Sequence, residues 1–141
     1  MGISTASLSV RSIQYYVNVG RWLSDLDFFK IEAAFLVCLL NDYFARVSDD
    51  RPHFEQLKKL EKKLFKLQND IRQADLKLRN QIYSIEQIAG GLVPDGEEEL
   101  AERQLSLESL IPKLTAEYRG SKRELFTIIE NMIRVCNFFA G

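Results

Sequence analysis

Apolar side chains recur every seven residues along two long stretches of this chain, and that repeat constrains its fold more than any other feature. Two apolar positions per heptad are typical of a helix that packs lengthwise against another helix. We therefore expect one helix over residues 52–89, with Gln81 among its core positions. A polar core residue costs stability, so Gln81→Leu should raise the melting temperature. Its two series are Leu57, Leu64, Ile71, Leu78 and Ile85, and Leu60, Leu67, Ala74, Gln81 and Ile88.

The second stretch, residues 97–138, carries the same repeat around a proline. Glutamates at positions 97–99 suit the positive N-terminal end of a helix dipole. Pro112 removes a backbone hydrogen bond, which kinks a helix or splits it near Leu110. Because the repeat resumes beyond Pro112, we expect a kink rather than a new direction. The two series are Leu100, Leu107, Leu114, Ser121, Ile128 and Val135, and Ile111, Tyr118, Leu125, Met132 and Phe139.

A connection of only seven residues, 90–96, joins these two helices. Gly90 and Gly91 can end the first helix in the left-handed conformation, and Pro94, Asp95 and Gly96 form a turn sequence. Helices roughly 55–60 Å long, at ~1.5 Å per residue, must lie antiparallel when so short a loop joins them. Residues 51–141 are therefore expected to form a long antiparallel coiled-coil hairpin.

Residues 1–50 are expected to form a short helical pair, with helices over residues 6–23 and 27–47. Residues 24–27 offer capping side chains, so the chain either turns there or bends slightly, and we favour a turn. The helix over 27–47 has two adjoining apolar rows, which predict packing against more than one neighbour. These rows are Phe28, Ile31, Phe35 and Leu39, and Phe29, Ala33, Leu36, Leu40, Tyr43 and Val47.

The expected fold is thus all-α, a single domain of four helices. Two short helices can cover only one end of the long hairpin. That end would hold a four-helix core, and residues 71–114 would project as a two-helix stalk. The residues expected in the four-helix core are Phe35, Leu39, Leu64, Leu125, Ile129 and Met132.

Four apolar residues of this stalk lie off the heptad core and are candidates for a partner-binding site: Leu76, Ile82, Tyr83 and Leu105. A two-helix stalk has nothing to bury them against, and aligned exposed apolar residues indicate a protein partner or a second copy of the chain. The alternative is that they are isolated surface residues without a role.

A ridge of five lysines occupies outer positions of the helix over 52–89: Lys58, Lys59, Lys62, Lys63 and Lys66. Such a ridge could bind an acidic protein, nucleic acid or anionic lipid. No aromatic residues are interleaved for base stacking, so the nucleic-acid signal is not strong. We favour a solvated helix face with local ion pairs.

The sequence gives little support to a catalytic or metal-binding site. A single histidine, His53, cannot supply paired Glu-x-x-His ligands, and we expect no cofactor and no metal. Cys38 and Cys136 lie in apolar helical contexts and are expected to be core residues of a cytoplasmic protein. The longest apolar run is far short of the ~20 residues that cross a bilayer.

The sequence therefore favours a non-catalytic interaction module, such as an assembly subunit, an adaptor or a chaperone-like protein. One alternative is a small helical-bundle enzyme or ligand carrier with a site among the aromatic residues of the N-terminal helices. The other is a binder of anionic surfaces that uses the lysine ridge. The aromatic residues of the first alternative are Tyr15, Tyr16, Trp22, Phe28, Phe29, Phe35, Phe138 and Phe139.

Overall fold

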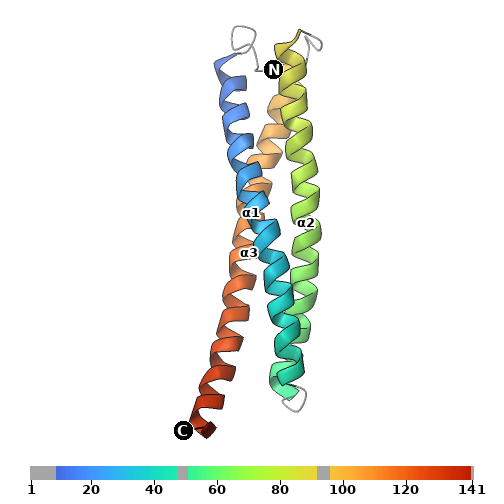
Figure 1. Cartoon of the computed structure of the whole chain (residues 1–141). Helices are drawn as coiled ribbons and strands as arrows, with labels where there is room; N and C mark the ends of the chain where they lie inside the picture. Colours follow the sequence, from blue (N-terminus) through green and yellow to red (C-terminus); the bar gives the residue numbers. More distant parts are fainter. Residues whose placement is uncertain (1–8, 48–50, 92–95, 141) are drawn as a thin grey trace. The chain divides into compact units, whose positions relative to one another are not determined.

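The chain forms three long helices, seen in a computed structural model that describes residues 9–47, 51–91 and 96–140, the last six as backbone only (Figure 1). The helices are α1 (Val10–Arg46), α2 (Arg51–Ala89) and α3 (Glu97–Ala140). The all-α class is confirmed, and no strand occurs among the described residues. The expectation of four helices is wrong, because residues 10–46 form one helix.

Helix α1 continues without a break through residues 24–27, where a turn was favoured. Ser24, Asp25 and Asp27 are exposed and cost a helix only a few tenths of a kcal/mol each. Between them Leu26 is fully buried, and burying a leucine stabilises by about 1.5–3 kcal/mol. The core requirement of this position therefore outweighs the local capping signal.

The buried residues of α1 follow a heptad of their own. One series consists of Ser12, Val19, Leu26, Ala33, Leu40 and Val47, all buried. A second contains buried Phe29 and Leu36 and half-buried Tyr15, Trp22 and Tyr43. Thus α1 packs in the same way as α2 and α3, with one apolar seam along its length.

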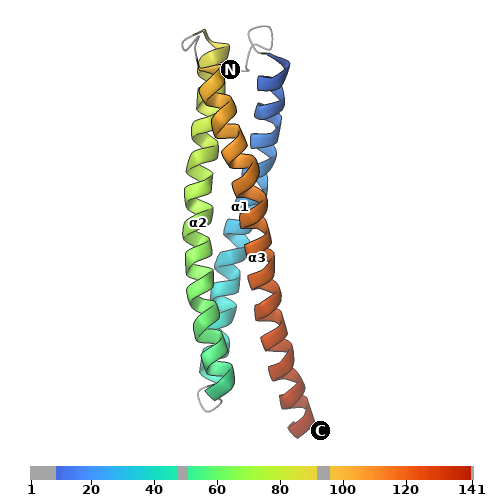
Figure 2. The ribbon, with the colours of Figure 1, turned by 180° about the vertical axis from the view of Figure 1, so that it is seen from behind.

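Two compact units make up the chain, and each takes a segment from every helix. The first contains Met1–Phe28 and Ile71–Lys113, and the second contains Phe29–Asp70 and Leu114–Gly141. Within each unit the segments of α1 and α3 run in one direction and that of α2 in the other (Figures 1 and 2). The predicted two-helix stalk is therefore wrong, because α1 also packs with residues 71–113.

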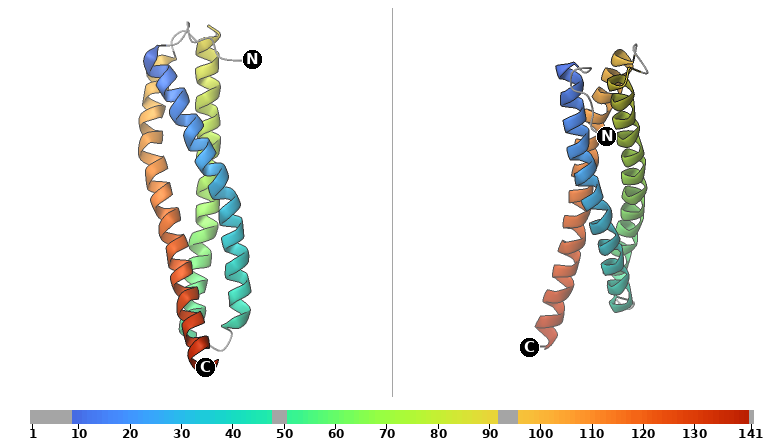
Figure 3. Two further views of the ribbon diagram at one scale, coloured as in Figure 1. Left: turned by 60° about the vertical axis from the view of Figure 1, so that its left-hand side comes forward. Right: turned by 45° about the horizontal axis from the view of Figure 1, so that its top comes forward.

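A buried polar layer lies in the first unit, whose three helical segments Figure 3 shows from two further directions. Gln81 Nε2 donates to the carbonyl oxygen of Leu100 and to Gln104 Oε1, both at 3.0 Å. Arg103 Nε donates to Gln81 Oε1 at 3.1 Å. Gln81 is thus confirmed in the core, and Gln104 Nε2 is buried with no hydrogen-bond partner among the described residues.

The core of the second unit contains buried leucines from all three helices and a stacked aromatic pair. The rings of Phe29 and Tyr118 stack with centroids 4.5 Å apart. Of the residues expected in this core, Leu64, Leu125 and Ile129 are buried, and Leu39 and Met132 are half-buried. Phe35 was wrongly placed there, because the heptad of α1 turns it outward.

The ends and the proline of the long helices follow the sequence closely. Gly91 has a φ of 73° just beyond the end of α2, a conformation that side-chain-bearing residues rarely adopt. Helix α3 continues through Pro112, so it is not split near Leu110. The expected turn at residues 94 and 95 lies outside the described residues.

The polar layer changes the expected effect of leucine at position 81. Gln81→Leu should destabilise the protein by about 1–3 kcal/mol, because it leaves the buried Gln104 amide without its partner. The double variant Gln81→Leu, Gln104→Leu should recover the loss or exceed the wild-type stability, since both partners are then apolar. Urea unfolding measures all three proteins. A single variant more stable than the wild type would show that the Gln81–Gln104 bond does not form.

Candidate functional site

The four residues predicted to bind a partner all lie in the first unit. Leu76 and Tyr83 on α2 and Leu105 on α3 are exposed, and Ile82 is half-buried. Three of them are thus accessible. They were chosen because a two-helix stalk could not bury them, and that reason no longer holds. With α1 packed in this unit, these are exposed positions of a three-helix core rather than of a thin stalk.

Three of the five lysines of the ridge form ion pairs with carboxylates in the second unit. Lys66 Nζ lies 2.9 Å from Asp70 Oδ2, and this bond raises the pKa of Lys66. Lys63 Nζ lies 3.2 Å from Glu124 Oε2, across the interface of α2 and α3. Lys58 is 3.8 Å from Glu61, whereas Lys59 and Lys62 have no ion pair with another described residue. This pattern matches the solvated face that the sequence favoured.

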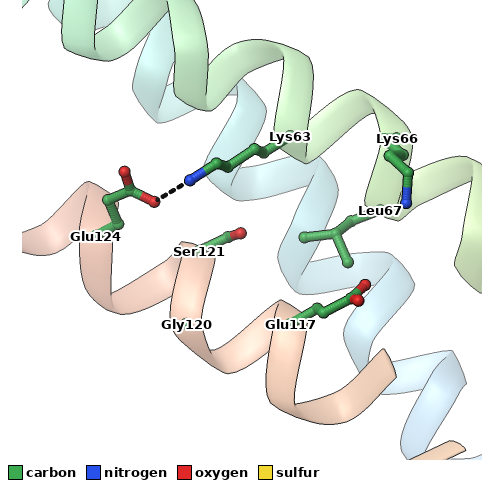
Figure 4. Close-up of a pocket in the computed structure, with 7 residues that line it drawn as sticks. All are labelled: Lys63, Lys66, Leu67, Glu117, Gly120, Ser121 and Glu124. Carbon is green, nitrogen blue, oxygen red and sulfur yellow. Dashed lines mark hydrogen bonds and ion pairs between the residues drawn. The ribbon is translucent and has the colours of Figure 1, made fainter. Parts of the chain in front are cut away.

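A groove of mixed charge lies beside this ridge, between α2 and α3 of the second unit (Figure 4). It holds a cavity of about 450 Å³. A side chain at Gly120 would meet no atom within 4 Å, so the glycine leaves this wall open. Because the groove presents both signs of charge, it offers no uniform field to a polyanion. The lining residues are Lys63, Lys66, Leu67, Glu117, Gly120, Ser121 and Glu124.

A polar cluster joins α1 to α3 in the second unit. The hydroxyl of Tyr118 donates to Glu32 Oε1, and Lys122 Nζ lies 2.9 and 3.0 Å from the two carboxylate oxygens. The hydrogen bond from Tyr118, together with Lys122, lowers the pKa of Glu32. Burial, together with this bond, raises the pKa of Tyr118. The cluster ties α1 to α3 and is compatible with the rotation of α1 that buries its heptad.

That rotation leaves an apolar part of α1 exposed in the second unit. Ile31 is 73% exposed and Phe35 60%, and Cys38 is exposed as well. Spacings of three and four residues place these three on one side of a helix. We call Ile31, Phe35 and Cys38 the α1 outer face. The expectation that Cys38 is a core residue is wrong, and the side chain of Cys136 lies outside the described residues.

The sequence contained the signal for this face, but its interpretation was wrong. Phe28, Ile31 and Phe35 were recognised as one of two apolar rows and were given a second neighbour within the chain. In the structure Leu36 and Leu40 of the other row are buried, whereas Ile31 and Phe35 stay exposed. An apolar row in excess of what the fold can cover is the feature that identifies the face.

Comparison of the chain with known protein families, curated proteins and solved structures finds no match in any of the three. Within the described ranges, no helix has the length and apolar content needed to cross a membrane. The same residues contain no group of three or more histidine, cysteine or acidic side chains placed to hold a metal ion.

The cluster around Glu32 predicts a stability that depends on acidic pH. Because its pKa in the folded protein is below the ordinary value of 4.5, Glu32 contributes stability above that value. The contribution is lost as pH falls through the folded pKa. Urea unfolding at a series of pH values should therefore show a shallower loss of stability at acid pH for Glu32→Gln than for the wild type. Equal pH dependence of the two proteins would mean that Glu32 is not paired.

Proposed function

We propose that this chain is a non-catalytic protein-interaction module that binds its partner through the α1 outer face. The observation that carries the proposal is the exposure of Ile31 and Phe35 on one side of a helix whose other side is buried. Aligned apolar residues in contact with water favour association, because burying each large side chain stabilises by about 1.5–3 kcal/mol.

The α1 outer face also has the form of a helix-docking surface. Residues 31, 35 and 38 are spaced i, i+4, i+7, a spacing by which helices present apolar anchors to a partner. The helix that carries them is held by its buried heptad and by the bonds from Glu32 to Tyr118 and Lys122. A surface fixed before binding loses little conformational entropy on association, which favours affinity.

The alternative of a ligand carrier with an aromatic site receives less support from the contacts. Phe29 stacks on Tyr118, and Tyr15 packs against the apolar cluster of Ile85, Ile88 and Leu100. These rings fill space between helices, as core residues do. The alternative of an anionic-surface binder is weakened by the ion pairs that Lys63 and Lys66 form. An interaction module accounts for more of the observations.

Site-specific photo-crosslinking in the cells of origin tests this proposal. A photoreactive phenylalanine analogue replaces Phe35 in one variant and Asn69, an exposed polar residue of α2 in the same unit, in the control. We expect discrete adducts from position 35 that position 69 does not give. Adding Ile31→Asp should abolish them, because a charge on the α1 outer face cannot be buried without a partner.

The comparison of labelling from positions 35 and 69 decides the outcome. Adducts with a second copy or with another protein both support an interaction through this face, since each requires a protein surface against Phe35. Equal labelling from positions 35 and 69, or labelling that survives Ile31→Asp, would contradict the proposal.

A further inference from the structure

A further cavity lies between α2 and α3 of the second unit, next to the groove of mixed charge, and we call it the basic cavity. Its volume of about 600 Å³ is within the range of ~300–1,000 Å³ that is typical of small-molecule sites. Both cavities are lined by Lys63, Gly120 and Glu124, and Figure 4 shows the ion pair of Lys63 with Glu124. The other residues that line the basic cavity are Gln56, Lys59, Arg123, Thr127, Ile128 and Asn131.

The basic cavity has an excess of positive charge that the groove of mixed charge lacks. Its lining contains three cationic side chains and one carboxylate, so two positive charges are in excess. The carboxylate, Glu124, is already paired with Lys63 at 3.2 Å. Lys59 and Arg123, which have no ion pair with another described residue, carry the excess. Because Lys59 belongs to α2 and Arg123 to α3, the two cations come from opposite walls of the cavity.

Uncharged polar side chains supply further hydrogen-bond donors in the basic cavity. Gln56 and Asn131 each carry an amide NH₂ group, and Thr127 carries a hydroxyl. None of the three is hydrogen-bonded to another described residue, and all three are exposed. The cavity therefore combines two unpaired cations with three neutral side chains that can donate.

A phosphoryl group in its dianionic form fits this set of side chains. It carries about two negative charges and three acceptor oxygens, which match the excess charge and the donors. Arginine binds phosphate oxygens through its planar fork, and lysine binds them as a point charge. A single carboxylate would leave one of the two cations without a partner.

We infer that the basic cavity binds a phosphoryl dianion, either inorganic phosphate or the phosphate monoester of a small molecule. Lys59 and Arg123 hold the anion between α2 and α3, and the neutral side chains donate to its oxygens. Because this site belongs to α2 and α3, the inference goes beyond the proposed function, which concerns α1. The cationic side chains are exposed and screened by salt, so we expect a Kd of about 1 mM for inorganic phosphate.

Titration of the full ¹⁵N-labelled chain, followed by NMR, tests the inference with inorganic phosphate as the probe. The pH is kept at ~8, above the second pKa of ~6 of a phosphate monoester. We expect saturable shifts at the amides of Lys59, Arg123 and Thr127 that sodium chloride of equal ionic strength does not give. A second arm uses glycerol phosphate. Tighter binding of this monoester identifies a phosphorylated small molecule as the ligand, and equal binding identifies free phosphate.

Charge reversal distinguishes a site from a general response of the lysine ridge. Lys59→Glu and Arg123→Glu should each weaken phosphate binding by about tenfold or more, because each replaces an attractive charge with a repulsive one. Lys62→Glu is the matched control, since Lys62 is an exposed, unpaired lysine of α2 that does not line the cavity. It should weaken binding by about twofold or less, because salt screens charges outside the site. Circular dichroism checks that these surface variants keep the helical fold.

Three results would overturn the inference. The first is the absence of saturable shifts up to about ten times the expected Kd. The second is an equal response to phosphate and to chloride, and the third is an equal loss of binding in Lys62→Glu and Lys59→Glu.

Discussion

The buried heptad of α1 is the constraint on which the rest of the structure depends. Val19, Leu26, Ala33 and Leu40 are buried at seven-residue intervals, so one side of α1 faces the other helices along its length. A helix with a single seam can satisfy only one apolar row in a three-helix unit. Every other property of α1, including what it presents to solvent, follows from which row is buried.

The polar and aromatic contacts of α1 favour the same orientation of this helix as its apolar seam does. Glu32 is bonded to Tyr118 and Lys122 of α3, and Phe29 stacks on the Tyr118 ring. Together they hold α1 in the orientation that its heptad requires. Ile31 and Phe35 stay exposed on the opposite side of the helix, and the proposed function follows from their exposure.

Helices α2 and α3 could be predicted from the sequence because their heptads are strict and their ends carry glycines or acidic residues. Helix α1 could not be predicted in this way, because the capping residues Ser24 and Asp25 are conspicuous, whereas the series through Val19, Leu26 and Ala33 is weakened by a small residue. The hydrogen bond that Tyr118 donates to Glu32 joins positions 86 residues apart, so no local sequence pattern predicts it. The apolar residues of the candidate site could be recognised in the sequence. Only the structure, with three helices instead of four, shows that Ile31 and Phe35 stay exposed.

Native-state hydrogen exchange at the backbone amides of residues 22–29 tests the central claim most directly, because this segment decides whether α1 is one helix. An unbroken, packed α1 predicts that these amides exchange only through global unfolding, with protection equal to that of the core amides around Leu64 and Leu125. Rapid exchange confined to residues 24–27 would show a turn there. That result would restore two short N-terminal helices, and the continuous seam of α1 and its outer face would both have to be abandoned.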